Sequence, residues 1–296
     1  MDGNFLMEIM KNGLLGIASS SISSFIGTMV SSLFLRKNTL TSEFEKIKIG
    51  KFNDLIDQLL ENGEITYLEF YKSKNLLEIA EKADRTYNKE KSGNFHQDNF
   101  KFDFDWFLRF FDYASNISNE EMQEVWAKVL SREIQYPNST SITLLNALSM
   151  MRQEQALLFC NISKFALMDI NEKFAHPLIF ISSNREVYET QNITPLILKN
   201  FDRLGLLECN FLDEYIFMNK KVFQTQDKII TVFGTSRSEQ KIKSGNVTFT
   251  RDGQLLYSML DDDSKKCDEE TLSFIIKRFE NRKCKIVIDK KSKGDV

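Results

Sequence analysis

The segment from Asp103 to Leu148 constrains the fold most strongly, because it holds both tryptophans of the chain between clear helix start and stop signals. Trp106 lies in a run of aromatic residues at helical spacing, and a second helix is predicted from Asn119 to about Gln135. Pro137 ends that helix, since a proline inside it would remove a backbone hydrogen bond. Aromatic side chains bury large areas, so this segment predicts a helical core and not a cofactor site.

Three helix starts fit the capping box, in which a hydroxyl and a carboxylate three residues apart satisfy free backbone amides. They are Ser42 with Glu45, Thr66 with Glu69, and Ser118 with Glu121. The first two predict helices over about residues 43–61 and 67–89, which form an antiparallel hairpin. Gly63 suits the left-handed position that ends the first of these helices.

The pattern changes after Met168, where runs of strand length replace the long helical repeats. The stretch EQALLFCNISKFALM, residues 154–168, is predicted to be helical, and HPLIFISS to be a short strand. Thr194 and Pro195 start a helix that Gly205 ends. Strands are then predicted at LLEC, EYIFMN, KIITVFG and NVTFT, followed by a helix in TRDGQLLYSML. This order looks like a winged-helix module with an enlarged wing.

We therefore predict an α+β fold that is mainly α, with a helical N-terminal body followed by a winged-helix-like α/β module. The predicted parts are a hydrophobic Gly/Ser-rich helix (1–36), a helical hairpin (41–91), an aromatic-rich helical core (100–168), the winged-helix-like module (178–260), and a C-terminal helix with a short strand and tail (268–296).

The N-terminal segment from Asn12 to Leu35 carries no charged residue, and its length suits a bilayer, although its serines and glycines weaken insertion. Two interpretations remain open: a helix that packs on the chain's own core or on a second subunit, and a helix that inserts into or lies on a membrane. The residues concerned are the small ones Gly16, Ser20 and Ser24 and the apolar ones Ile22, Phe25, Ile26, Met29 and Leu33.

No spacing in the sequence predicts a catalytic, metal or cofactor site. The four cysteines form no C-x-x-C pair, and two histidines are too few to complete a zinc site, so the thiols are expected to be reduced and buried. Glu120, Glu121 and Glu124 are typical of a helix start, where the helix dipole favours acidic residues. We assign no catalytic residue, no metal ligand and no cofactor.

The proposed wing is basic, although the whole chain has a net charge of -3. Between Met218 and Arg251 there are seven basic residues against two acidic ones, enough for contacts to phosphates. The preceding helix offers few side chains that could read bases, so nucleic-acid binding is the lesser prediction. The residues expected to make it are Lys220, Lys221, Lys228, Arg237, Lys241 and Lys243.

The central segment resembles a bacterial family of unknown function. Its motif is read here in Asp105-Trp106, in ISNEEMQ-x-x-WA-x-x-L from Ile117 to Leu130, and in Glu133, Pro137, Ser139 and Ser141. Similar pieces are Lys74 to Asp84 upstream and the GLL…TRDGQLL ending downstream. The motif residues we expect to be structural are Trp106, Met122, Gln123, Trp126, Leu130 and Pro137. Where the family often has glycine after the proline, this chain has Asn138.

The resemblance implies an intracellular bacterial protein, from a family often found with mobile elements or phage-defence genes. Our leading hypothesis is a non-enzymatic effector or accessory protein in antiviral defence, which binds a protein partner or assembles with itself and contacts the inner membrane through residues 12–35. A winged-helix regulator that binds nucleic acid is the alternative. An unrecognised metal-dependent hydrolase or nuclease is the third, because carboxylates can converge in space without any regular spacing.

Overall fold

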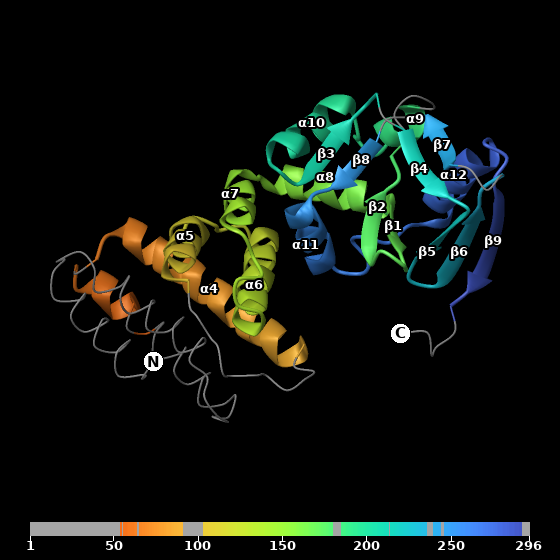
Figure 1. The fold of residues 1–296 in the computed structure, drawn as a ribbon. Coiled ribbons are helices and arrows are strands. Elements are labelled where there is room, and N and C mark those ends of the chain that lie inside the picture. Colours follow the sequence, from red (N-terminus) through yellow and green to blue (C-terminus); the bar gives the residue numbers. More distant parts are fainter. Residues whose placement is uncertain are drawn as a thin grey trace. The chain divides into compact units, whose positions relative to one another are not determined.

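The computed structural model describes residues 54, 56–63, 65–90, 103–179, 185–212, 214–235, 239–243 and 246–291. The chain forms two compact units, Met1–Leu145 and Asn146–Val296, and each is described by itself (Figure 1). Their boundary falls inside the range 100–168 that was predicted as one helical core. The expectations for residues 12–35 and for the capping box at Ser42 lie outside the described residues.

In the described part of the first unit the longest helix is α4 (Tyr67–Glu90). Helices α5 (Phe104–Ala114) and α6 (Glu120–Gln135) pack on it (Figure 1). The aromatic segment forms its core, as predicted. The Trp106 ring stacks on Phe110 with 5.3 Å between centroids, and Phe110 meets the edge of Trp126 at 5.4 Å. Trp126 is fully buried. Helix α7 (Ile142–Met150) follows and spans the boundary between the units.

Side-chain capping explains where these helices start. At Thr66 the box is confirmed, since Glu69 accepts from the Thr66 amide at 2.8 Å and Thr66 Oγ1 accepts from the Glu69 amide at 3.3 Å. The box at Ser118 is wrong. Asn119 is the N-cap of α6, and its Oδ1 accepts from the Met122 amide at 3.0 Å. An asparagine side chain caps as well as serine does, so the cap moves one residue along the chain.

The second unit is built on an antiparallel five-stranded sheet with the order β2-β1-β5-β6-β9 (Figure 1). Its strands are β1 (Ala166–Asp169), β2 (Phe174–Pro177), β5 (Lys220–Gln224), β6 (Lys228–Phe233) and β9 (Lys285–Lys290). Two further pairs form between β3 (Leu207–Asn210) and β8 (Asn246–Phe249) and between β4 (Glu214–Met218) and β7 (Glu239–Lys243). The helices are α8 (Gln153–Lys164), α9 (Arg185–Glu189), α10 (Pro195–Arg203), α11 (Arg251–Met259) and α12 (Glu269–Glu280).

The α+β class is confirmed, and so are the helix starts at Thr194 and Thr250. The helix predicted over residues 154–168 is too long: α8 ends at Lys164, and β1 begins at Ala166 and pairs with β2 and β5. Strands β5 and β7 were not predicted. Four strands lie between β3 and β8 in the sequence. Of these, β4 and β7 pair with each other, and β5 and β6 belong to the five-stranded sheet. The winged-helix likeness of this module stays a prediction.

Candidate functional site

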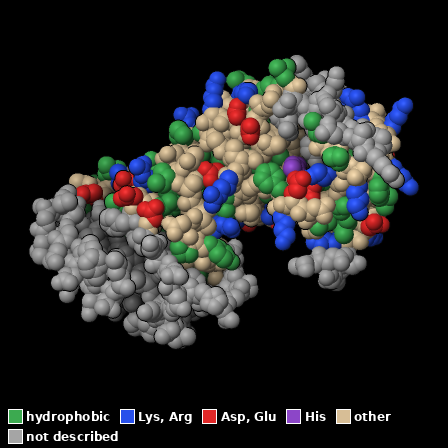
Figure 2. All heavy atoms as spheres, in the orientation of Figure 1, with side chains coloured by type: hydrophobic (Ala, Val, Ile, Leu, Met, Phe, Trp, Pro, Cys, Tyr) green, Lys and Arg blue, Asp and Glu red, His purple; other side chains and the backbone are tan. Residues whose placement is uncertain are grey.

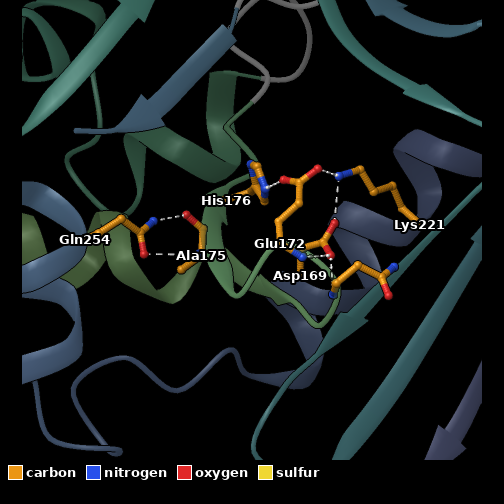
Figure 3. Close-up of polar contacts among 7 residues, drawn as sticks. Asp169, Glu172, Ala175, His176, Lys221 and Gln254 are labelled. Atoms are coloured by element: carbon orange, nitrogen blue, oxygen red, sulfur yellow. Dashed lines mark hydrogen bonds and ion pairs between the residues drawn. The ribbon is translucent and has the colours of Figure 1, made fainter. Parts of the chain in front are cut away.

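Four charged or titratable side chains, from β1, β2, β5 and the turn between β1 and β2, meet on one face of the five-stranded sheet (Figure 3). Asp169 ends β1, Glu172 lies in the turn that follows, and His176 lies in β2. The Lys221 ammonium contacts Asp169 Oδ2 at 2.7 Å and also bonds Glu172 Oε1. The other oxygen of Glu172 is 2.9 Å from His176 Nε2. In Figure 2 a purple histidine side chain adjoins red and blue ones on the visible face.

The turn between β1 and β2 is held by Asp169 itself. Its Oδ1 accepts hydrogen bonds from the backbone amides of Asn171 at 2.8 Å and Glu172 at 3.0 Å, which is an Asx-type turn. Lys173 completes the turn in the left-handed conformation, with a φ of 52°. Antiparallel pairing of β1 with β5 sets Asp169 opposite Phe223, two residues from Lys221. The turn and the neighbouring strand together fix the cluster.

The charges in this cluster stabilise one another. Burial acts to raise the pKa of Asp169, but Lys221 and the two amides outweigh it, so this pKa is lowered. The hydrogen bond from Lys221 lowers the pKa of Glu172. Burial acts to lower the pKa of Lys221, yet the two carboxylates raise it on balance. Burial lowers the pKa of His176, which therefore carries a neutral ring at pH 7.

The cluster offers metal-ligand atoms as well as ion pairs. One oxygen each from Asp169 and Glu172 and one ring nitrogen of His176 lie within 4.8 Å of one another. Carboxylate and imidazole ligands suit Mn²⁺ or Zn²⁺. The Lys221 ammonium now occupies the space between the two carboxylates, so a divalent ion would have to displace it. The donor set therefore fits a metal only after Lys221 moves away.

Sequence reasoning did not find this cluster. Asp169, Glu172 and His176 follow one another closely, but the helix predicted over residues 154–168 left no place for β1, which holds Asp169. Lys221 is 52 residues from Asp169, in a strand that was not predicted. Recognition of the β1–β2 hairpin would have placed the carboxylates beside the histidine.

Two of the basic residues of the proposed wing form ion pairs within the fold. Lys221 is paired with Asp169 and Glu172, and Lys228 is paired with Glu269 of α12. Lys220 is exposed. Arg237 lies outside the described residues, and the side chains of Lys241 and Lys243 on β7 are not described. Nucleic-acid binding stays a prediction, and two of its six lysine and arginine side chains are engaged within the fold.

The residues of the central motif lie in the core of the first unit or at its loops. Met122, Gln123, Trp126 and Leu130 are buried along α6, and Trp106 along α5. Gln123 accepts from the buried Lys82 ammonium at 3.0 Å and donates to the Ile117 carbonyl at 3.1 Å.

The loop that carries Pro137 is tied down by a buried carboxylate. Glu133 accepts from the amides of Asn138 and Thr140 and from the Thr140 hydroxyl, the last at 2.6 Å. Asn138 adopts a left-handed backbone with a φ of 63°, which asparagine tolerates better than most residues. The chain therefore makes a tight turn with asparagine at this position.

The downstream motif joins α10, β3 and α11. Gly205 has a φ of 73°, and its carbonyl accepts from the Thr250 hydroxyl at 2.6 Å. The Thr250 hydroxyl in turn caps α11 by accepting from the Gly253 amide at 3.0 Å. A Cβ at Gly253 would lie 1.9 Å from the Leu206 carbonyl oxygen, so only glycine fits there. These contacts explain the GLL and TRDG parts of the motif as structural.

Burial raises the pKa of three of the cysteines, Cys209, Cys267 and Cys284. Cys209 and Cys284 are buried. Burial raises the pKa of Cys209 and of Cys267 to about 12, so their thiolate fractions are negligible. Among the helices that the structure describes, none combines the length and apolarity needed to cross a bilayer.

Comparison with known proteins places this architecture in one family. The family model described as a protein of unknown function (DUF2806) matches residues 64–266. This range includes α4, the central motif, the cluster around Asp169 and α11. No curated protein and no solved structure matches the chain. Because the match covers more than half of the sequence, the chain belongs to the DUF2806 family.

Proposed function

We propose that this chain is a non-enzymatic bacterial effector or accessory protein in phage defence, which acts by binding a protein partner. One observation carries the binding part of the proposal, while the defence role rests on the resemblance of the central motif: the first turns of α4 expose three large side chains, Tyr67, Leu68 and Tyr71, with 73%, 65% and 62% of their surface accessible. Tyr71 is four residues from Tyr67 and three from Leu68, so it adjoins both of them on one side of the helix. Tyrosine and leucine grouped in this way suit a protein interface better than a free surface.

The start of α4 is well suited to present these residues. Thr66 and Glu69 satisfy each other's amides, and the Thr66 hydroxyl also bonds Glu69 at 2.8 Å. A capped helix end does not fray, so the exposed side chains hold their positions before a partner binds. The interface would then lose little conformational freedom on binding.

A phage plaque assay tests the proposal. Cells that express the chain should show fewer plaques than cells without it, and the variant Tyr67→Ala/Leu68→Ala/Tyr71→Ala should lose this protection. Leu157→Ala is the control, since Leu157 on α8 is 54% exposed and lies in the other unit. Circular dichroism would show that both variants remain folded. Equal protection by the triple variant and the wild type would overturn the interface, and no protection by the wild type would overturn the defence role.

The proposal includes a membrane or self-assembly role for residues 12–35, which rests on their sequence alone. Fractionation of cells that express the chain with and without residues 1–36 tests it. Membrane association that depends on this segment is expected. Identical soluble behaviour of the two forms would remove the membrane part and leave the protein interaction intact.

A second candidate function is metal-dependent hydrolysis, and the convergence of Asp169, Glu172 and His176 favours it. A metal held there would supply an activated water, while the three side chains would bind and orient the ion. Titration calorimetry with Mn²⁺ and Zn²⁺ tests the site. The variant Lys221→Met should bind more tightly than the wild type, because it removes the competing ammonium, and Asp169→Asn should abolish the signal. No heat from any of these forms would end this candidate.

A further inference from the structure

Strand β9 lies at one end of the five-stranded sheet, and its only strand partner among the described residues is β6 (Figure 1). The pairing sets Val287 opposite Thr231, and the Lys291 amide bonds the Asp227 carbonyl at 2.9 Å. Hydrogen-bonded pairs alternate along an antiparallel ladder, so odd-numbered residues of β9 point their backbone groups at β6. The amides and carbonyls of Ile286 and Ile288 therefore point toward the open edge.

The sequence of β9 is self-complementary about Val287. If a second β9 runs antiparallel with Val287 on the two-fold axis, Lys285 lies opposite Asp289 of the second copy, and Asp289 opposite its Lys285. Ile286 of each copy lies opposite Ile288 of the other, and the two copies of Val287 lie opposite each other. Directly opposite residues project on the same face of a sheet, so each of these pairs can make contact.

We propose that two copies of this chain associate through β9, which joins two five-stranded sheets into one of ten strands. Ile286 and Ile288 would each exchange backbone hydrogen bonds with Ile288 and Ile286 of the second copy. Val287 sits in a non-hydrogen-bonded pair, where opposite side chains are closest. Val287 and Ile288 are 36% and 46% exposed in the single chain, so the pairing removes apolar surface from water.

Other registers fit the strand less well. Directly opposite residues of an antiparallel ladder are both hydrogen-bonded or both not, so the axis has to pass through a residue. An axis at Ile288 sets Lys285 opposite Lys291 and Ile286 opposite Lys290, and an axis at Ile286 sets Lys285 opposite Val287. Like charges directly opposite destabilise a pair, and an apolar side chain gains little against a lysine. The two-fold pairing also uses the open edge of both copies, so it closes at a dimer and does not grow into a fibre. Charge and apolar pattern therefore both select a second copy in one register.

A cysteine at the axis tests the register directly. In a non-hydrogen-bonded pair the Cα atoms lie about 4.5 Å apart, within the range that a disulfide spans. Val287→Cys should form a covalent dimer under mild oxidation, seen on a non-reducing gel. Ile288→Cys is the matched control, because its counterpart in the second copy is two residues out of register. The wild type controls for the four native cysteines. Equal cross-linking of both variants, or none of Val287→Cys, overturns the proposal.

Charge exchange between Lys285 and Asp289 tests the same register without covalent chemistry. Lys285→Asp alone and Asp289→Lys alone each place two like-charge pairs in the interface. Each should raise the dimer dissociation constant at least about tenfold in sedimentation equilibrium. The double variant Lys285→Asp/Asp289→Lys restores both opposite-charge pairs and should return the constant to near that of the wild type. Assembly through any other part of the chain would be indifferent to these charges. A wild type that stays monomeric, or single variants that dimerise like it, overturns the proposal.

Discussion

Trp126 shows how much one side chain contributes to the first unit. It is fully buried, and Phe110 and Tyr113 pack edge-on against its ring. Trp126→Ala should lower the free energy of unfolding by about 3–5 kcal/mol, because a large cavity replaces the ring. Urea denaturation measures the loss, and Trp126→Phe, which keeps most of the ring volume, should lose less. A loss below about 1 kcal/mol would place this tryptophan outside the core.

Lys221 has the opposite role, because it balances a charge and does not fill space. Asp169 is completely buried, so Lys221→Met would leave its carboxylate without a counter-charge. We expect a loss of about 3 kcal/mol, at the lower end for a broken buried pair, since the Lys221 side chain is 15% exposed.

A double-mutant cycle checks this expectation for Lys221. The variant Asp169→Asn/Lys221→Met has no uncompensated charge, so it should be more stable than Lys221→Met alone. Additive losses in the double variant would mean that the ion pair contributes nothing to stability.

Gly253 is required because the Leu206 backbone leaves no room for a Cβ at this position. Alanine would gain up to about 1 kcal/mol in helix propensity, but its Cβ would collide with a backbone carbonyl at 1.9 Å. The backbone cannot rotate away as a side chain can, so the collision decides the sign. Gly253→Ala should lower the stability of the second unit by about 2 kcal/mol. Arg251→Ala, exposed at the same helix start, should change stability by less than about 0.5 kcal/mol in the same thermal scan.

At the scale of elements, the β1–β2 hairpin should make stability depend on pH. The lowered pKa values of Asp169 and Glu172 give stability that is complete above about pH 4.3 and is lost as the pH falls through their folded values. The lowered pKa of His176 adds a loss that begins below about pH 6.5. The raised pKa of Lys221 gives stability that is complete below about pH 10.5 and is lost above it.

The expected stability curve has a plateau between about pH 7 and 10. Urea midpoints measured from about pH 2 to 10 would show the plateau and a decline on its acid side. In Lys221→Met the acid decline should be smaller, because the carboxylates lose the partner that lowers their pKa. A midpoint that stays constant from pH 7 to pH 4 would contradict this assignment.

Elements with local signals could be predicted from the sequence, and elements defined by distant partners could not. Helix α4 was placed within a residue at each end, because Thr66 and Glu69 cap it from within. The end of α8 was missed, since Phe165 to Met168 continue its apolar spacing and only pairing with β2 and β5 makes them extended. Strands β5 and β7 are rich in lysine and glutamine, which carry little strand propensity of their own.

For the whole molecule, the sequence located the aromatic core but not the charged cluster. Core positions follow from apolar spacing along one helix, so Trp106 and Trp126 were recognisable. The cluster depends on β5 lying beside β1, and no local pattern reports such a pairing. The boundary at Leu145 was hidden for the same reason, since α7 carries an unbroken apolar pattern across it.

The order of strands in the five-stranded sheet has a consequence for synthesis on the ribosome. Strand β1 can pair with β2 as soon as both have been synthesised. Its other partner is β5, in which Phe223 lies opposite Asp169, and β5 is synthesised more than 50 residues later. Until then one edge of the nascent β1–β2 hairpin is unpaired, and the Asp169 carboxylate lacks its ion-pair partner Lys221. Long-range pairing of this kind is slow. Folding of the second unit should thus be the stage at which the nascent chain most needs chaperones. The rate of translation between β2 and β5 should determine how long β1 remains without its second partner strand.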